Sequence, residues 1–227
     1  MAEKTPERGK AAADDRNLID SEASAGGLDF ETWVISFWQT NRRTILSAII
    51  LALVIVVGLQ LYRIISAQRE SATREAYAEA TTDEARKAFA ESHRGHPLAG
   101  AALLTLADAA YGRGDYSEAA GLYEAAASGL DLPALAFRAT LGQGISLLQS
   151  GLQSKGEPIL VGLAGNTAAP EAIRSEALYH LASLAIAATE TEKARDYLDS
   201  IEELSPVGIW ASRATALRNT LPRPAAE

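Results

Sequence analysis

Residues 103–126 read LLTLADAAYGRGDYSEAAGLYEAA, and this stretch decides the fold of the chain. Its first half places apolar and small residues at the three- and four-residue spacing of one helix face, and its second half does the same. Between them lies Gly114-Asp115, which is typical of a helix end followed by a cap. Because the apolar face of each half carries small residues, the two helices can pack closely. The stretch therefore predicts a helical hairpin whose inward positions are Leu103, Leu106, Ala107, Ala110, Ala119, Tyr123 and Ala126.

Similar hairpins recur on both sides of this one. Taking Ala85, Ala119, Gly156 and Ala194 as equivalent small positions gives spacings of 34, 37 and 38 residues. The pattern resembles the tetratricopeptide repeat, whose period is about 34 residues. The third unit departs from it, because Gln143 replaces an expected Leu and Pro158 lies early in the second helix.

We therefore expect an all-α fold in which residues 63–221 form a tetratricopeptide-like α-solenoid. It should contain about three to four helix pairs. Residues 207–220 should add a single capping helix that covers the last exposed repeat face.

Residues 44–62 read TILSAIILALVIVVGLQLY, 19 residues without a charge, bounded by Arg42-Arg43 and Arg63. As a helix this stretch is about 28 Å long, close to the hydrocarbon thickness of a bilayer. A cleaved signal peptide would place its apolar stretch nearer the N-terminus. We therefore predict one transmembrane helix, which continues without a Gly or Pro into the first repeat helix.

The flanks of this stretch differ in character. Asp29 is a candidate cap for an amphipathic interfacial helix over residues 29–43, in which Phe30, Trp33, Val34, Phe37 and Trp38 share one face. That face suits either interfacial anchoring or docking onto a membrane partner. Residues 1–28 lack apolar periodicity and are expected to form a disordered acidic tail. Residues 222–227 are expected to form a disordered C-terminus. Flanking cations, two before and three after, do not decide the orientation.

Composition and motifs argue against several classes of function. The formal charge of -8 disfavours nucleic acid, and the absence of Cys excludes thiolate chemistry. No third metal ligand is apparent for His93 and His96, so we expect them at a solvated helix end. We expect His180 to pack in the core or to lie at the surface. Gly112-Arg-Gly-Asp lacks the ending of a phosphate loop. We expect no enzyme activity, cofactor, metal or small-molecule substrate.

Stacked helix pairs form a concave groove lined by the first helix of each unit, which makes protein binding the expected role. Tetratricopeptide geometry places in the groove Leu104, Asp108, Tyr111, Arg138, Leu141, Tyr179 and Ser183, together with Ala101, Ile145 and Glu176. Tyr111, Arg138 and Tyr179 are of the types that dominate binding hot spots. The alternative for each residue is packing against a neighbouring helix.

Two segments, WVISFWQTNRRTI at residues 33–45 and GDYSEAAGLYEAA at residues 114–126, carry a further resemblance. With the tail, the single span and the repeats, they resemble the YfgM-like family of bacterial inner-membrane proteins. That resemblance implies an accessory of the Sec translocon with a cytoplasmic N-terminus. Its periplasmic repeat domain would contact translocon subunits, chaperones or translocating clients.

Two other roles stay open. The first is an envelope scaffold for cell-division or outer-membrane assembly machinery, which also uses anchored tetratricopeptide repeats. The second is an enzyme or regulator acting through the acidic tail.

Overall fold

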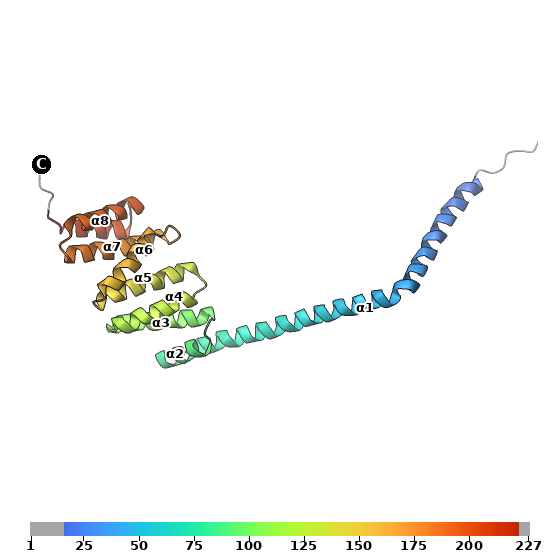
Figure 1. Ribbon diagram of the computed structural model, residues 1–227, viewed down its shortest axis with the longest axis horizontal. Helices are drawn as coiled ribbons and strands as arrows, with labels where there is room; N and C mark the ends of the chain where they lie inside the picture. Colours follow the sequence, from blue (N-terminus) through green and yellow to red (C-terminus); the bar gives the residue numbers. More distant parts are fainter. Residues whose placement is uncertain (1–15, 223–227) are drawn as a thin grey trace, which may run out of the picture. The chain divides into compact units, whose positions relative to one another are not determined.

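The computed structural model describes residues 16–222, with side chains from residue 30 onward. Every regular element in this part of the chain is an α-helix, which confirms the all-α prediction (Figure 1). The chain divides into two compact units at Gln68–Arg69.

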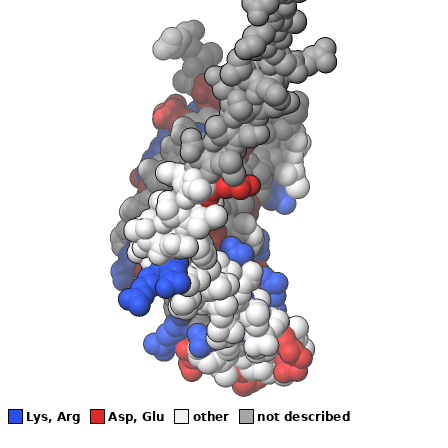
Figure 2. Space-filling view, turned by 90° about the vertical axis from the view of Figure 1, so that its right-hand side faces the viewer, with Lys and Arg blue, Asp and Glu red and all other residues white. Residues whose placement is uncertain are grey.

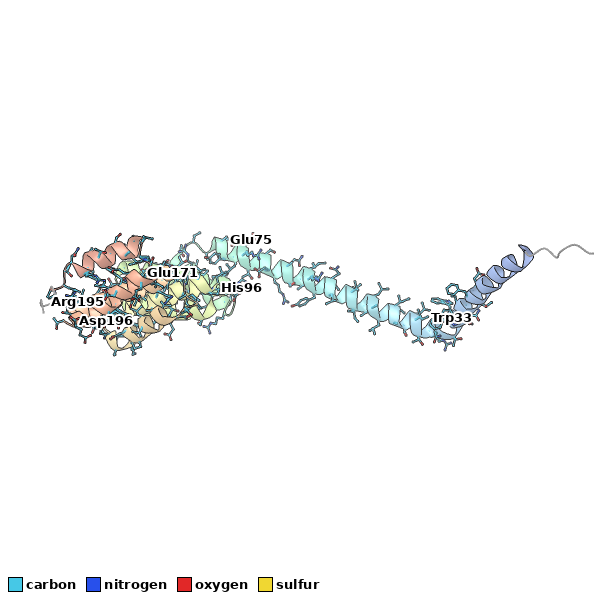
Figure 3. The ribbon with its side chains drawn as sticks, turned by 90° about the horizontal axis from the view of Figure 1, so that it is seen from above. Trp33, Glu75, His96, Glu171, Arg195 and Asp196 are labelled. Atoms are coloured by element: carbon cyan, nitrogen blue, oxygen red, sulfur yellow. The ribbon has the colours of Figure 1, made fainter. Side chains whose placement is uncertain are left out.

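The first unit is formed by helix α1, which spans Arg16–Glu79 and so extends into the second unit. Its segment Phe30–Glu79 is long and apolar enough to cross a membrane, with a mean hydropathy of 2.7 in the most apolar window. None of that window is buried against other parts of the protein. Trp33 projects outward from the helix (Figure 3), and its ring stacks on Phe37 with centroids 5.5 Å apart.

The course of α1 differs from the predicted segments. Residues 16–28, expected in a disordered tail, belong to α1, whereas residues 1–15 and 223–227 lie outside the described part of the chain. Asp29 lies inside the helix and not at its start, because the helix begins 13 residues earlier. Residues 29–43, the apolar stretch and the first repeat helix are thus parts of one continuous helix. This is possible because α1 contains no Pro, the residue that disfavours a helix interior most strongly.

The described part of the second unit contains three full helix pairs. Before them α2 (Asp83–Ser92) takes the place of the second helix of a first repeat, and its Phe89 packs edge-on against Tyr77 of α1 at 5.5 Å. Figure 1 shows the remaining helices side by side in chain order. The pairs are α3 (Pro97–Arg113) with α4 (Tyr116–Gly129), α5 (Pro133–Gln149) with α6 (Gln153–Gly165), and α7 (Glu171–Ala187) with α8 (Thr191–Leu204).

Helix α9 (Ile209–Arg218) packs against both α7 and α8 and buries Ala211 and Ala214. It therefore occupies the place that the first helix of another repeat would take. This confirms the predicted capping helix, with bounds slightly inside the expected residues 207–220.

Three of the turns inside the pairs are built alike. Gly114, Gly151 and Thr189 each have a positive φ, of 86°, 82° and 60°. In each turn the next residue donates its amide to a carbonyl five residues earlier, as in Asp115 N to Ala110 O at 3.0 Å. This is the Schellman arrangement, which satisfies the free carbonyls at a helix end.

The third repeat folds as a regular helix pair, although its sequence is the least typical. Its small position, Gly156, is buried, and a Cβ there would lie 2.7 Å from the Gly144 carbonyl oxygen. Backbones therefore approach so closely that only Gly fits. Pro158 is accommodated within α6.

Ion pairs also join the helices of this unit. Arg113 pairs with Asp83 at 3.2 Å, and Lys193 pairs with Glu157 at 2.8 Å. Charged side chains of both signs are spread among uncharged ones on the face seen in Figure 2. Exposed pairs of this kind contribute little to stability, so apolar packing dominates it.

Candidate binding groove

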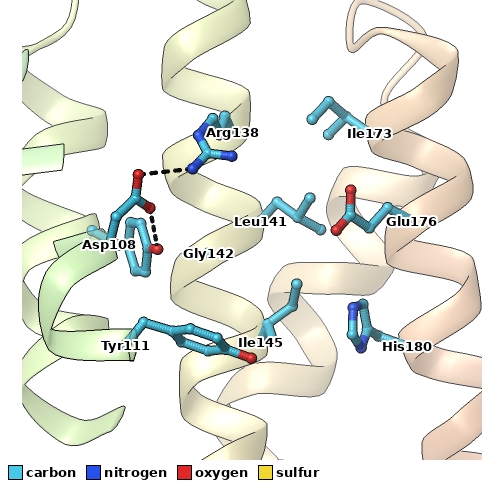
Figure 4. Close-up of a pocket in the computed structure, with 10 residues that line it drawn as sticks. Asp108, Tyr111, Arg138, Leu141, Gly142, Ile145, Ile173, Glu176 and His180 are labelled. Carbon is cyan, nitrogen blue, oxygen red and sulfur yellow. Dashed lines mark hydrogen bonds and ion pairs between the residues drawn. The ribbon is translucent and has the colours of Figure 1, made fainter. Parts of the chain in front are cut away.

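A groove of about 460 Å³ lies between the first helices of three successive repeats, α3, α5 and α7 (Figure 4). Each helix presents one face to it, since the lining residues recur at intervals of three, four and seven. The lining residues are Asp108 and Tyr111 from α3, Arg138, Leu141, Gly142 and Ile145 from α5, and Ile173, Glu176 and His180 from α7, with Tyr123 from α4.

Tyr123 reaches this groove from the second helix of its repeat. Its ring lies against Gly142, where an added Cβ would come within 2.7 Å of ring carbons. Because Gly142 has no side chain, the Tyr123 hydroxyl passes α5 and donates to Asp108 Oδ1 at 2.5 Å. Tyr123 is only 5% exposed, so this hydrogen bond satisfies a polar atom on an otherwise buried side chain.

Asp108 connects Tyr123 to Arg138. Its second oxygen, Oδ2, accepts a hydrogen bond from Arg138 Nη2 at 2.8 Å. That bond raises the pKa of Arg138, while burial and then the hydrogen bond to Asp108 raise the pKa of Tyr123. Two repeats are therefore bridged by a phenol, a carboxylate and a guanidinium, and Tyr123 stays protonated at neutral pH.

The opposite wall carries Glu176 and His180. Burial raises the pKa of Glu176, and the charges of Arg138 and Arg213 only partly oppose that shift. Burial lowers the pKa of His180, with Arg213 adding to the effect, so the imidazole is neutral at pH 7. Figure 4 shows both side chains on α7, facing α5 across the groove.

The structure brings together four of the seven residues predicted for the groove: Asp108, Tyr111, Arg138 and Leu141. Ile145 and Glu176 also line it, whereas Ala101 does not. Five of the predicted residues on α3 and α5 thus share one pocket, and their role in binding stays a prediction.

Leu104, Tyr179 and Ser183 lie outside the groove. Leu104 is 8% exposed and belongs to the core between α3 and α4. Tyr179 packs against Trp210 of α9, with ring centroids 5.7 Å apart, and Ser183 Oγ donates to the Tyr179 carbonyl. Tyr179 therefore faces α9, and the groove is lined on α7 by Ile173, Glu176 and His180.

Sequence reasoning missed four lining residues: Tyr123, Gly142, Ile173 and His180. Gly142 carried a usable signal, because a Gly inside a helix often marks a close approach by another group. His180, predicted to be packing or surface, is a partly buried lining residue.

His93 and His96 both have structural partners, which corrects the prediction of a solvated helix end. His93 stacks on Phe89 at 4.3 Å. The Nδ1 atom of His96 accepts from the Leu98 amide and caps α3, so Nε2 carries the proton and donates to Glu70 at 3.0 Å. Within the described residues, no group of three or more His, Cys, Asp or Glu side chains is placed to hold a metal ion.

Comparison with protein families agrees with this geometry. The family model described as a tetratricopeptide repeat-like domain matches residues 36–141. A tetratricopeptide repeat-like domain is thus present. The match extends from the aromatic segment of α1 across the apolar stretch to α5 and includes half of the groove. No curated protein and no solved structure matches the chain. Domains of this type are generally protein-interaction modules.

Proposed function

We propose that this protein is a membrane-anchored module that binds other proteins in the groove between α3, α5 and α7. The observation that carries the proposal is the groove itself, in which apolar side chains and a few polar groups from three repeats converge. The apolar segment of α1 supplies the anchor, since no residue of its most apolar window is buried within the protein. The family match supports a combined role for the apolar segment and the repeats, because the matched residues include the apolar stretch.

The resemblance to YfgM-like proteins refines this proposal. It supports a single-pass protein of the bacterial inner membrane, with the N-terminus in the cytoplasm and the repeat domain in the periplasm. There the groove would bind translocating clients or chaperones beside the Sec translocon. The envelope scaffold is the alternative, and it differs only in the partners that the groove recruits.

Photocrosslinking tests the binding site and its partner together. With p-benzoylphenylalanine in place of Ile145, we expect adducts with translocon subunits or periplasmic folding factors after irradiation of whole cells. The same group in place of Glu124, exposed on α4, is the matched control. Recovery of division or outer-membrane assembly proteins would favour the scaffold, and an absence of adducts specific to position 145 would overturn the binding proposal.

Orientation needs a separate measurement. Alkaline phosphatase fused after Glu227 is expected to be active, because that enzyme requires disulfides that form outside the cytoplasm. A cytoplasmic reporter such as β-galactosidase at the same position should be inactive. The reverse pattern would contradict the periplasmic assignment.

A further inference from the structure

One charged side chain in the groove has no protein partner. Among the described residues, the half-buried carboxylate of Glu176 makes no hydrogen bond and no ion pair. The other carboxylate of the groove, Asp108, accepts from both Tyr123 and Arg138. A partly buried carboxylate without donors is unfavourable for the folded protein, so it is a feature that a ligand could satisfy.

Two arginines lie within electrostatic range of Glu176, and both have other partners. Arg138 donates to Asp108 at 2.8 Å, and the guanidinium of Arg213 lies 4.6 Å from the centre of the Trp210 ring. His180, one turn along the same face of α7, is neutral at pH 7. Asp108 and Arg138 pair with each other, and Arg213 acts on Glu176 only through its charge, so the Glu176 carboxylate is the charged group of the groove lining to which no described residue donates.

The lining beside Glu176 is apolar. Ile173, which is partly buried, precedes it by one turn of α7, and Leu141 and Ile145, only 4% and 8% exposed, lie across the groove on α5 (Figure 4). An apolar side chain of a ligand would be removed from water there, and a neighbouring cation could reach the carboxylate in a setting less polar than bulk water. A charge-assisted hydrogen bond is stronger in such a setting than at an open surface.

We propose that the groove selects peptide segments in which a Lys or Arg lies next to a large apolar residue, the cation pairing with Glu176 and the apolar side chain packing on Leu141, Ile145 and Ile173. This inference rests on the proposed function, since it names the chemistry of the segment that the binding groove takes. The same charge disfavours segments rich in Asp and Glu.

Peptide selection with the full chain in lipid nanodiscs tests this directly. A phage-displayed library of random 12-residue peptides is selected on wild type, on Glu176→Gln and on Glu124→Gln, an equal charge change on an exposed residue of α4. We expect wild type and Glu124→Gln to enrich peptides with Lys or Arg beside Leu, Ile or Phe. Glu176→Gln should enrich apolar peptides without that preference for cations.

The affinities of one selected peptide for wild type and for Glu176→Gln then measure the contribution of the pair between the peptide cation and Glu176. Fluorescence anisotropy with a fluorescein-labelled copy should show about tenfold weaker binding when its Lys is replaced by Ala, and little further loss when that peptide meets Glu176→Gln. A preference for cations that is absent, that persists in Glu176→Gln, or that weakens equally in Glu124→Gln would overturn the inference and leave the binding role intact. Failure to enrich any peptide over empty nanodiscs would instead remove the proposed function, and the inference with it.

Discussion

Thr189 has a left-handed backbone conformation at the turn where the equivalent repeats have Gly114 and Gly151. A β-branched residue is strained there, because its Cβ approaches the neighbouring backbone. The hydrogen bond from Glu190 N to Ala185 O, 2.8 Å long, holds the turn in place despite this strain. The repeat pattern thus imposes its geometry on a residue that disfavours it.

Thr189→Gly is therefore expected to stabilise the protein by about 1 kcal/mol, through relief of the left-handed strain. The reciprocal substitution, Gly114→Thr, should destabilise it by a similar amount. Urea unfolding followed by circular dichroism measures both changes. A lower midpoint for Thr189→Gly would show that its side chain contributes more than its strain costs.

The raised pKa of Glu176 makes the stability of the folded protein depend on pH. The pKa of Glu176 is raised in the folded protein, so between the unfolded and folded pKa values the folded state binds more protons and stability falls as pH rises. Glu176→Gln removes this loss. We expect the variant to unfold at a higher temperature than wild type at pH 7, and the difference to vanish below about pH 4, where Glu is protonated in both states. A constant difference across this range would rule out titration as the cause.

At the scale of elements, helix α5 is placed by glycines on two of its faces. Gly142 receives the ring of Tyr123 from α4, and a Cβ at Gly144 would lie 2.6 Å from Leu160 of α6. Glycine lowers the intrinsic stability of a helix, so its presence here reflects packing with both neighbours. The position of Tyr123 in the groove follows from this close approach.

Gly142→Ala should therefore destabilise the protein by about 1–3 kcal/mol, because the new methyl group overlaps the Tyr123 ring. Gly121→Ala is the matched control: it also lies inside a helix, α4, but an added Cβ meets no atom within 4 Å. That change should stabilise the protein by about 0.5–1 kcal/mol. Equal effects from the two substitutions in thermal melts would argue against the close contact at Gly142.

At the scale of the whole molecule, the buried core formed by the described side chains lies in the second unit. All four clusters of buried apolar residues fall between Ala76 and Leu221, and no residue from 30 to 68 is buried. Hydrophobic burial provides most of the stability of a fold, so the repeats do not need the apolar segment in order to fold.

A fragment comprising residues 69–227 is accordingly expected to fold in buffer without detergent. Its melting temperature should lie within a few degrees of the value for the repeats in the full chain in nanodiscs. Size-exclusion chromatography and circular dichroism provide the measurements. A fragment that is unfolded or aggregated would show that α1 before Arg69 contributes to the core.

The sequence by itself determined the helix pairs, the apolar segment and part of the groove lining on α3 and α5, namely Asp108, Tyr111, Arg138, Leu141 and Ile145. These depend on periodicity within a helix and on turns at Gly114 and Gly151, which are local properties. Which residues of α7 line the groove was decided by the tertiary structure, because Tyr179 packs against Trp210 of α9 while Glu176 and His180 lie in the groove. Tyr123 enters the groove for a similar reason, since its route depends on Gly142 of another repeat. Contacts between repeats of different length leave no period in the sequence, and only the packed structure shows them.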